Sequence, residues 1–277
     1  MRIRAVVVAL LAGGLLALAA SFAFAYPSLN GPTGLATLPS AEVLSPGQID
    51  LAVNYLGVKG SDLGGDVANA LGQYMDKAYN AQAVIGIQGN AELWALVTDA
   101  QGSDLRIYGA GGKIQLMREP VSRATVAIGA GLHRVQNSGD QNVVSAYVVA
   151  TKDFTRQAES VYQWEQASGA GLKGSAGLLY VDYGDLGDHI LRPFLGLEMF
   201  NGPSSLVVEY RFEDKNVDNQ GVFGVALRHS FDENLSGTIG FTNGGLVLAG
   251  TDKSYLFLGL AYRLGAGQKV NWGDWGW

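Results

Sequence analysis

The sequence predicts an all-β chain that forms a transmembrane, antiparallel up-and-down β-barrel of about twelve strands. Three observations support this fold class. First, apolar residues alternate with small or polar ones, at a period of two, along much of the chain. Second, the alternating segments run to roughly 10–14 residues, whereas strands of globular proteins average about 5–6 and membrane-crossing strands need about 9–11. Third, 39 of the 277 residues are glycine and only 16% are charged, against about 25% charged residues in ordinary soluble domains.

The last alternating segment illustrates the pattern. In residues 254–264, Leu256, Leu258 and Leu260 fall on one face, and Gly259 and Arg263 fall on the other. Segments with this period are typical of strands. The candidates are 48–58, 81–89, 91–99, 105–118, 122–135, 142–154, 171–183, 190–200, 204–213, 220–231, 234–243 and 254–264.

The breaks between these segments alternate in length, as they do in outer-membrane barrels. Tight turns are expected at 89–90, 118–122, 201–203 and 232–234, and longer polar loops at 59–80, 100–104, 136–141, 184–189, 214–219 and 244–253. Residues 155–170 depart from the rule, because a long polar stretch stands where a tight turn is expected. An even number of strands places both ends of the barrel on one side, which we expect to be the periplasmic side.

The amino-terminal residues have the pattern of a secretory signal. Arg2 and Arg4 precede a long apolar run, and Ala23-Phe24-Ala25 provides a small-x-small cleavage site. A membrane-anchoring helix is the alternative, but glycines interrupt the run and no stop-transfer charges follow it. The expected organisation is a cleaved signal peptide (1–25), a periplasmic N-terminal lead-in (26–46), a transmembrane β-barrel (47–264) and an aromatic C-terminal tail (265–277).

Many glycines fall on the face of each strand that we expect to line the barrel. Such residues would weaken a soluble sheet, but in a barrel wall they are expected to allow bending and to leave room in the lumen. They are Gly109, Gly111, Gly129, Gly131, Gly177, Gly196, Gly224, Gly240 and Gly259. The alternative is a secreted soluble β-sandwich or barrel. A water-facing sheet of that kind should carry many more charges than these strands do.

Aromatic residues near the strand ends are expected to form girdles at the membrane interface and to contact outer-membrane lipid. They are Tyr55, Tyr108, Tyr180, Tyr183, Tyr210, Phe231 and Tyr262.

The sequence favours no catalytic site. His229 and Ser230 are neighbours on one strand, so their side chains point to opposite faces and cannot pair, and no serine is spaced to pair with His133. The chain has no cysteine, no metal-ligand spacing and no phosphate- or dinucleotide-binding motif, so we expect neither a metal nor a cofactor. A net charge of −6 without a basic block argues against nucleic acid as a partner.

Charged residues on the inner face are the best functional candidates. They and a histidine on that face are Asp50, Lys113, His133, Glu198, Glu209, Arg211, Arg228 and Arg263. Rings of charge inside a pore set its ion selectivity. Alternatively, these residues form a network of ion pairs that fills and stiffens the lumen.

Two segments carry a family resemblance. The opening LNGPTGLATLPSAEVLSPGQIDLAVNY resembles that of YjbH-like, exopolysaccharide-associated outer-membrane barrels, and the match rests on Gly31, Pro32, Gly34, Leu35, Pro39, Ser40, Ala41, Pro46, Gly47 and Gln48. GAGGKIQLMREP and RPFLGLEMFNGPSSLVVEYRFED look like strands of the same group. The end of the last strand, residues 259–264, resembles the assembly signal of outer-membrane barrels, which implies the barrel-assembly machinery as a partner.

The sequence therefore predicts a non-enzymatic protein in the outer membrane of a bacterium with a two-membrane envelope. The leading function is a passive pore or a component of envelope or exopolysaccharide transport, with an envelope polysaccharide or a small solute as the partner. The alternatives are a lipid-acting hydrolase and a non-conducting structural or export-accessory barrel.

Overall fold

The computed structural model describes twelve long strands and a segment that precedes them. The described residues are 26–59, 77–87, 90–101, 105–117, 124–136, 140–155, 170–186, 189–213, 221–244 and 250–265. The strands are β1 (Ile49–Lys59), β2 (Lys77–Ile87), β3 (Ala91–Gln101), β4 (Arg106–Met117), β5 (Thr125–Gln136), β6 (Asp140–Asp153), β7 (Ala170–Asp182), β8 (His189–Asn201), β9 (Ser204–Arg211), β10 (Val222–Ser230), β11 (Leu235–Gly244) and β12 (Gly250–Leu264). A short 3-10 turn, Gly184–Leu186, follows β7.

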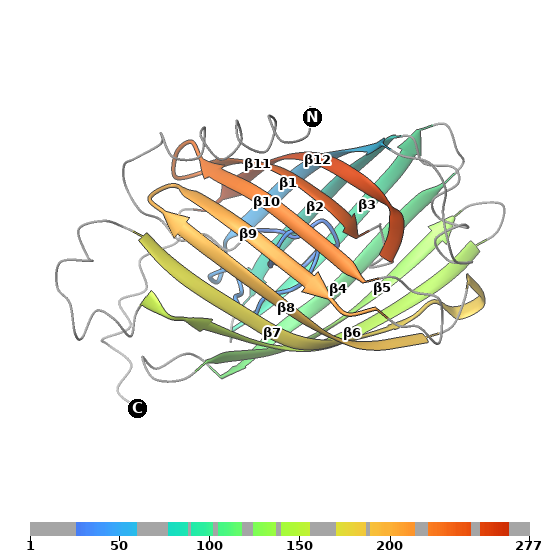
Figure 1. Ribbon diagram of the computed structural model, residues 1–277, viewed down its shortest axis with the longest axis horizontal. Coiled ribbons are helices and arrows are strands. Elements are labelled where there is room, and N and C mark those ends of the chain that lie inside the picture. The colour runs from blue at the N-terminus through green and yellow to red at the C-terminus, as the bar shows by residue number, and fades with distance from the viewer. Residues whose placement is uncertain are drawn as a thin grey trace, which may run out of the picture.

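The strands close into one antiparallel barrel, as Figure 1 shows. Each strand pairs with its neighbours in the sequence, and β1 pairs with β12 from Ile49 opposite Leu264 to Lys59 opposite Ser254. The predicted fold class is thus confirmed, with twelve strands. We call the end where β1 begins and β12 ends the near end of the barrel, and the opposite end the far end.

The outer face of the wall is apolar over most of its height. Leu93, Leu132 and Leu195 point outward and are each about half exposed, at 50%, 52% and 50%. Toward the far end this belt gives way to exposed ion pairs, Asp99 with Arg106 and Arg134 with Asp140. An apolar outer belt bounded by polar residues is what a bilayer requires of a β-barrel that crosses it. Within the described part of the chain, no helix has the length and apolar character needed to cross a bilayer.

Residues 26–44 lie inside the barrel, which corrects the expected periplasmic lead-in over 26–46. We call residues 26–44 the luminal segment. Figure 1 draws it as a blue loop between the front and back walls, and almost all of its residues are buried. It folds back on itself through two isolated bridges, Pro27 to Thr33 and Gly34 to Pro39. Only Glu42 among these residues is charged, so the segment can enter the interior at little desolvation cost.

The inner glycines do not leave room in the lumen, because side chains lie directly against them. A Cβ on Gly111 or Gly131 would lie 2.5 Å from the Trp94 ring, and the same ring lies against Gly31 of the luminal segment. The side chains that cover the other inner glycines are His133, Tyr147, Phe194, Leu35, Glu209, Phe257 and Asn54. Each glycine therefore makes space for a large or polar neighbour, and the interior is packed.

Several finer expectations differ from the structure or fall outside it. Strand β2 begins at Lys77 rather than 81, so the first loop is shorter than expected. Tyr183 is 1% exposed and points inward, so it is not part of an interfacial girdle. The expected signal peptide (1–25), the stretch 156–169 and the tail beyond Gly265 lie outside the described residues.

Because the Trp94 ring lies against glycines, adding one methyl group at such a glycine should lower the stability of the barrel markedly. We expect Gly131→Ala to lower the free energy of unfolding by about 1–3 kcal/mol, because the new Cβ overlaps the Trp94 ring. Urea unfolding followed by far-ultraviolet circular dichroism measures this. Gly57→Ala is the control, since the nearest atom to its Cβ would be 3.4 Å away. In a Trp94→Leu background the penalty should largely disappear; an unchanged penalty there would contradict the assignment.

Candidate functional site

The inner face carries all eight residues that the sequence analysis singled out. Their positions are Asp50 on β1, Lys113 on β4, His133 on β5, Glu198 on β8, Glu209 and Arg211 on β9, Arg228 on β10 and Arg263 on β12. Seven are buried, and Arg263 is half-buried. Sequence reasoning missed Glu92 on β3, which is fully buried. The alternation of β3 would have placed it beside Trp94 and Leu96 on the inner face.

The lumen has two layers of different chemistry. Most inner-face charges lie in the half of the wall toward the near end: Asp50, Glu92, Lys113, Asp153, Lys173, Glu198, Arg228 and Arg263. The half toward the far end is lined mainly by apolar side chains with exposures of 3% or less: Leu56, Leu105, Ile107, Val135, Val143, Val181, Tyr183, Ile190, Tyr255 and Phe257. Most of the contacts of the luminal segment lie in the charged half, the Leu29 carbonyl reaches Asn80 in the far-end half, and the leucines of the segment join the same hydrophobic core.

One anchor point for the luminal segment is built from Glu92 and Lys113, on adjacent strands. The Glu92 carboxylate accepts hydrogen bonds from the N–H of Thr33 at 2.8 Å, from the Thr33 hydroxyl, and from the N–H of Leu44 at 3.2 Å. Lys113 Nζ lies 3.1 Å from Glu92 and donates to the carbonyl of Thr33 at 2.8 Å and to that of Ser40 at 3.1 Å. We call these wall residues the Glu92 station. Its buried charges are paired with each other and with the segment.

A second anchor point repeats this arrangement on β9 and β10. The Glu209 carboxylate accepts from the N–H of Thr37 at 2.9 Å, from the N–H of Leu38 at 3.2 Å, and from the Thr37 hydroxyl. Arg228 donates to the carbonyls of Gly34 and Leu35 at 3.1 and 2.7 Å. We call Glu209 and Arg228 the Glu209 station. At both stations, an acid binds N–H groups and a base binds carbonyl groups of the segment.

Further contacts hold the segment from other strands. Thr151 on β6 accepts from the N–H of Ala41 at 2.9 Å, and Gln115 on β4 donates to the carbonyl of Ala41 at 3.0 Å. Lys173 on β7 pairs with Glu42 at 2.6 Å. The segment is therefore tied to several sides of the wall.

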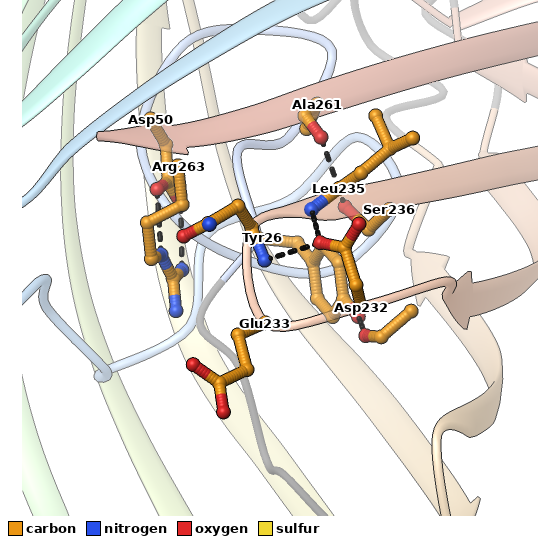
Figure 2. Close-up of a pocket in the computed structure, with 10 residues that line it drawn as sticks. Tyr26, Asp50, Asp232, Glu233, Leu235, Ser236, Ala261 and Arg263 are labelled. Atoms are coloured by element: carbon orange, nitrogen blue, oxygen red, sulfur yellow. Dashed lines mark hydrogen bonds and ion pairs between the residues drawn. The ribbon is translucent and has the colours of Figure 1, made fainter. Parts of the chain in front are cut away.

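The β1–β12 seam carries a charge pair of its own. Arg263 donates to both carboxylate oxygens of Asp50 at 2.7 Å, in a bidentate contact between directly opposed residues. Figure 2 shows this pair in a pocket at the near end, together with Tyr26 and the β10–β11 turn. Asp232 in that turn accepts the N–H groups of Asn234 and Leu235, which lower its pKa. Burial raises the pKa of Tyr26, whose hydroxyl bonds to Ser230 at 2.6 Å.

The luminal charges thus pair with one another and with the luminal segment. The sequence analysis left two arrangements open: charge rings that set ion selectivity, or a network of ion pairs that fills the lumen. The observed geometry is the network of ion pairs. Glu198 extends the network, at 3.8 Å from Arg228. Among the described residues, no cluster of three or more His, Asp or Glu side chains could hold a metal ion.

One serine–histidine contact exists outside the lumen. His229 and Ser230 point to opposite faces, as expected, but His229 Nδ1 lies 2.9 Å from the hydroxyl of Ser204 on β9. The register of β9 and β10 places these two residues opposite each other on the outer face, which the sequence alone did not reveal. Within the described residues, no carboxylate contacts the pair. His133 packs against Trp94, with ring centroids 5.4 Å apart.

The Glu209 station makes a testable prediction about stability. We expect Glu209→Gln to lower the free energy of unfolding by about 2–4 kcal/mol, because the amide leaves N–H groups of the segment and the Arg228 charge imperfectly paired in a buried site. Asp99→Asn is the matched control. It removes a carboxylate from an exposed pair and should cost no more than about 1 kcal/mol. Equal losses in the two variants would contradict the anchoring role.

The similarity of this chain to known proteins is structural and does not extend to sequence. No protein-family model and no curated protein matches the sequence. Among solved structures, the chain is similar to the KdgM porin (12% identity, TM-score 0.48, covering 77% of this chain and 98% of that one). It is also similar to Omp33 of Acinetobacter baumannii (10%, TM-score 0.48, 78% and 98%) and to an outer membrane channel of Pseudomonas putida F1 (10%, TM-score 0.42, 81% and 98%). The likeness is one of fold alone, that of outer-membrane β-barrels.

Proposed function

We propose that this chain is a pore-type transport protein of the bacterial outer membrane whose lumen is closed by its own luminal segment. On this proposal the near end faces the periplasm. The observation that carries it is the set of charged side chains that line the near-end half of the lumen. Buried ion pairs are often no more stable than apolar residues of similar volume, so a barrel that only had to be filled would gain nothing from them. Charged side chains are well solvated in water, so they are compatible with a lumen that becomes hydrated when the segment leaves.

The balance of charge indicates what such a lumen would pass. Among the strand residues whose side chains the structure describes, five acidic and six basic ones point inward, including Arg192 on β8. Because the two signs nearly cancel, a hydrated lumen should discriminate only weakly between cations and anions. This suits a small polar solute better than a highly charged one. Exopolysaccharide export, which the family resemblance of residues 31–48 implies, remains a prediction.

A non-conducting structural barrel is a second candidate, and the apolar far-end layer favours it. Side chains such as Phe257 and Ile107 are 1% exposed, and a dry apolar constriction blocks ions even without a plug. The two candidates differ in whether displacement of the luminal segment produces a current.

Planar-bilayer recording of the refolded protein separates these candidates. We expect the unmodified protein to open rarely and Glu92→Gln/Glu209→Gln to open at least about tenfold more often, since both stations lose their charge-assisted bonds to the segment. The reversal potential in a salt gradient should lie close to zero. Asp99→Asn should behave like the unmodified protein. If the folded double variant carries no current at all, the pore is excluded and the structural barrel is favoured.

A lipid hydrolase is the third candidate, and the contact between Ser204 and His229 is the feature that favours it. The pair faces outward close to the near end of the barrel, where it would be accessible to lipid. The histidine could accept the serine proton during attack on an ester, but hydrolases of this type also need a group that orients the histidine.

We expect no fatty-acid release from phospholipid vesicles that contain the barrel, because no carboxylate within the described residues orients His229. Release that is abolished by both Ser204→Ala and His229→Ala, but retained in Ser230→Ala, would establish the hydrolase instead. Titration of the liberated acid is a direct readout.

A further inference from the structure

The contacts of the luminal segment are those of a bound peptide. Most of them involve its main chain: the N–H groups of Thr33, Thr37, Leu38, Ala41 and Leu44, and the carbonyls of Thr33, Gly34, Leu35, Ser40 and Ala41. At each station an acid faces N–H groups while a neighbouring base faces carbonyls. The wall therefore supplies groups complementary to a polypeptide backbone at two separate places.

Side chains of the segment add sequence selectivity. The Thr37 hydroxyl donates to the buried carboxylate of Glu209, and the Thr33 hydroxyl lies 2.8 Å from the buried carboxylate of Glu92 and 2.7 Å from the Glu42 carbonyl. Leu35 packs onto the bare backbone of Gly196, where a Cβ would lie 2.0 Å from its Cδ1. Gly31 adopts a φ of 113° and lies against the Trp94 ring, where a Cβ would lie only 2.3 Å from the ring. The recognised sequence is thus residues 31–38, GPTGLATL.

The covalent link between the segment and the barrel wall is exposed. Ser45, Pro46 and Gly47 connect the buried residues to β1 at the near end, and all three are exposed. Gly47 has no atom within 4 Å of the position a Cβ would take. The buried contacts described above all lie on the amino-terminal side of this link, so they do not depend on it.

We propose that the lumen is a binding site for a peptide with the sequence of residues 26–44, and that it retains this peptide without the covalent link. Release and rebinding of the peptide would then open and close the barrel. Only this second statement rests on the proposed pore function. The natural occupant is the chain's own segment, and a peptide supplied in trans from the near end can take its place.

The test cuts the link after the barrel has folded. A protease site is inserted between Pro46 and Gly47 of the full chain, and the folded protein is cleaved and passed through a sizing column. We expect the fragment that ends at the cut to remain with the barrel. Thr33→Val/Thr37→Val should release it, because each hydrogen bond between a hydroxyl and a buried carboxylate contributes about 1.5–3 kcal/mol, which corresponds to at least about tenfold in affinity.

The matched control is Ser28→Ala. Ser28 is a buried hydroxyl of the same segment that has no hydrogen-bond partner among the described residues. This variant should retain the fragment like the unmodified protein. A labelled synthetic peptide of residues 26–44, added to barrels emptied through the double variant, gives the dissociation constant directly by fluorescence anisotropy. The valine-substituted peptide should bind at least about 100-fold more weakly.

The outcomes separate the inference from the proposed function. Immediate loss of the unmodified fragment on cleavage, or unfolding of the barrel as judged by circular dichroism, would overturn the peptide site. Retention of the fragment in the double variant would overturn the role of the two threonines. Specific peptide binding without any current through emptied barrels supports the site and rejects the pore. Current that the added peptide blocks supports both.

Discussion

Closure of twelve strands is the constraint on which the rest of this structure depends. In lipid, every backbone N–H and carbonyl group must be paired within the protein, and pairing β1 with β12 leaves no free edge. The interior of a barrel grows with its number of strands, and about eight strands enclose a space that wall side chains just fill. Twelve strands enclose more. Here the additional space is occupied by the luminal segment and by aromatic side chains that lie over glycines, such as Trp94 over Gly111 and Gly131.

The filling of the lumen is mainly polar toward one end and mainly apolar toward the other, and the proposed pore function depends on this division. Glu92 in the near-end half and Glu209 on β9 are buried, and their carboxylate oxygens accept hydrogen bonds from N–H groups of the segment. Such contacts can be exchanged for water, because the same groups are well solvated when exposed. The apolar side chains around Phe257 cannot form such hydrogen bonds with water. On the proposed pore function, opening of the barrel would depend first on release of the segment and then on hydration of the apolar layer.

Much of the wall could be predicted from the sequence because strand alternation is a local property. The prediction of β9 over 204–213 matches the observed Ser204–Arg211, and its inward face was correctly placed on Glu209 and Arg211. The interior was predicted less well. The sequence predicts a periplasmic position for residues 26–46, since nothing in their local pattern identifies a binding partner. Tyr183 was expected at the membrane interface, but it follows the last residue of β7, where alternation no longer decides direction.

The sequence by itself determined which strand side chains lie on the outer face and which lie on the inner face, because a period of two leaves each strand residue only two directions. Only the tertiary structure decided what the inward residues contact. Thr33 meets Glu92 across 59 positions and Thr37 meets Glu209 across 172, and closure of the barrel brings these partners together. The glycines show the same difference between local and tertiary information. Strand alternation places them on the inner face. The large side chains that lie against them come from other strands and from the luminal segment, so these contacts depend on the tertiary structure.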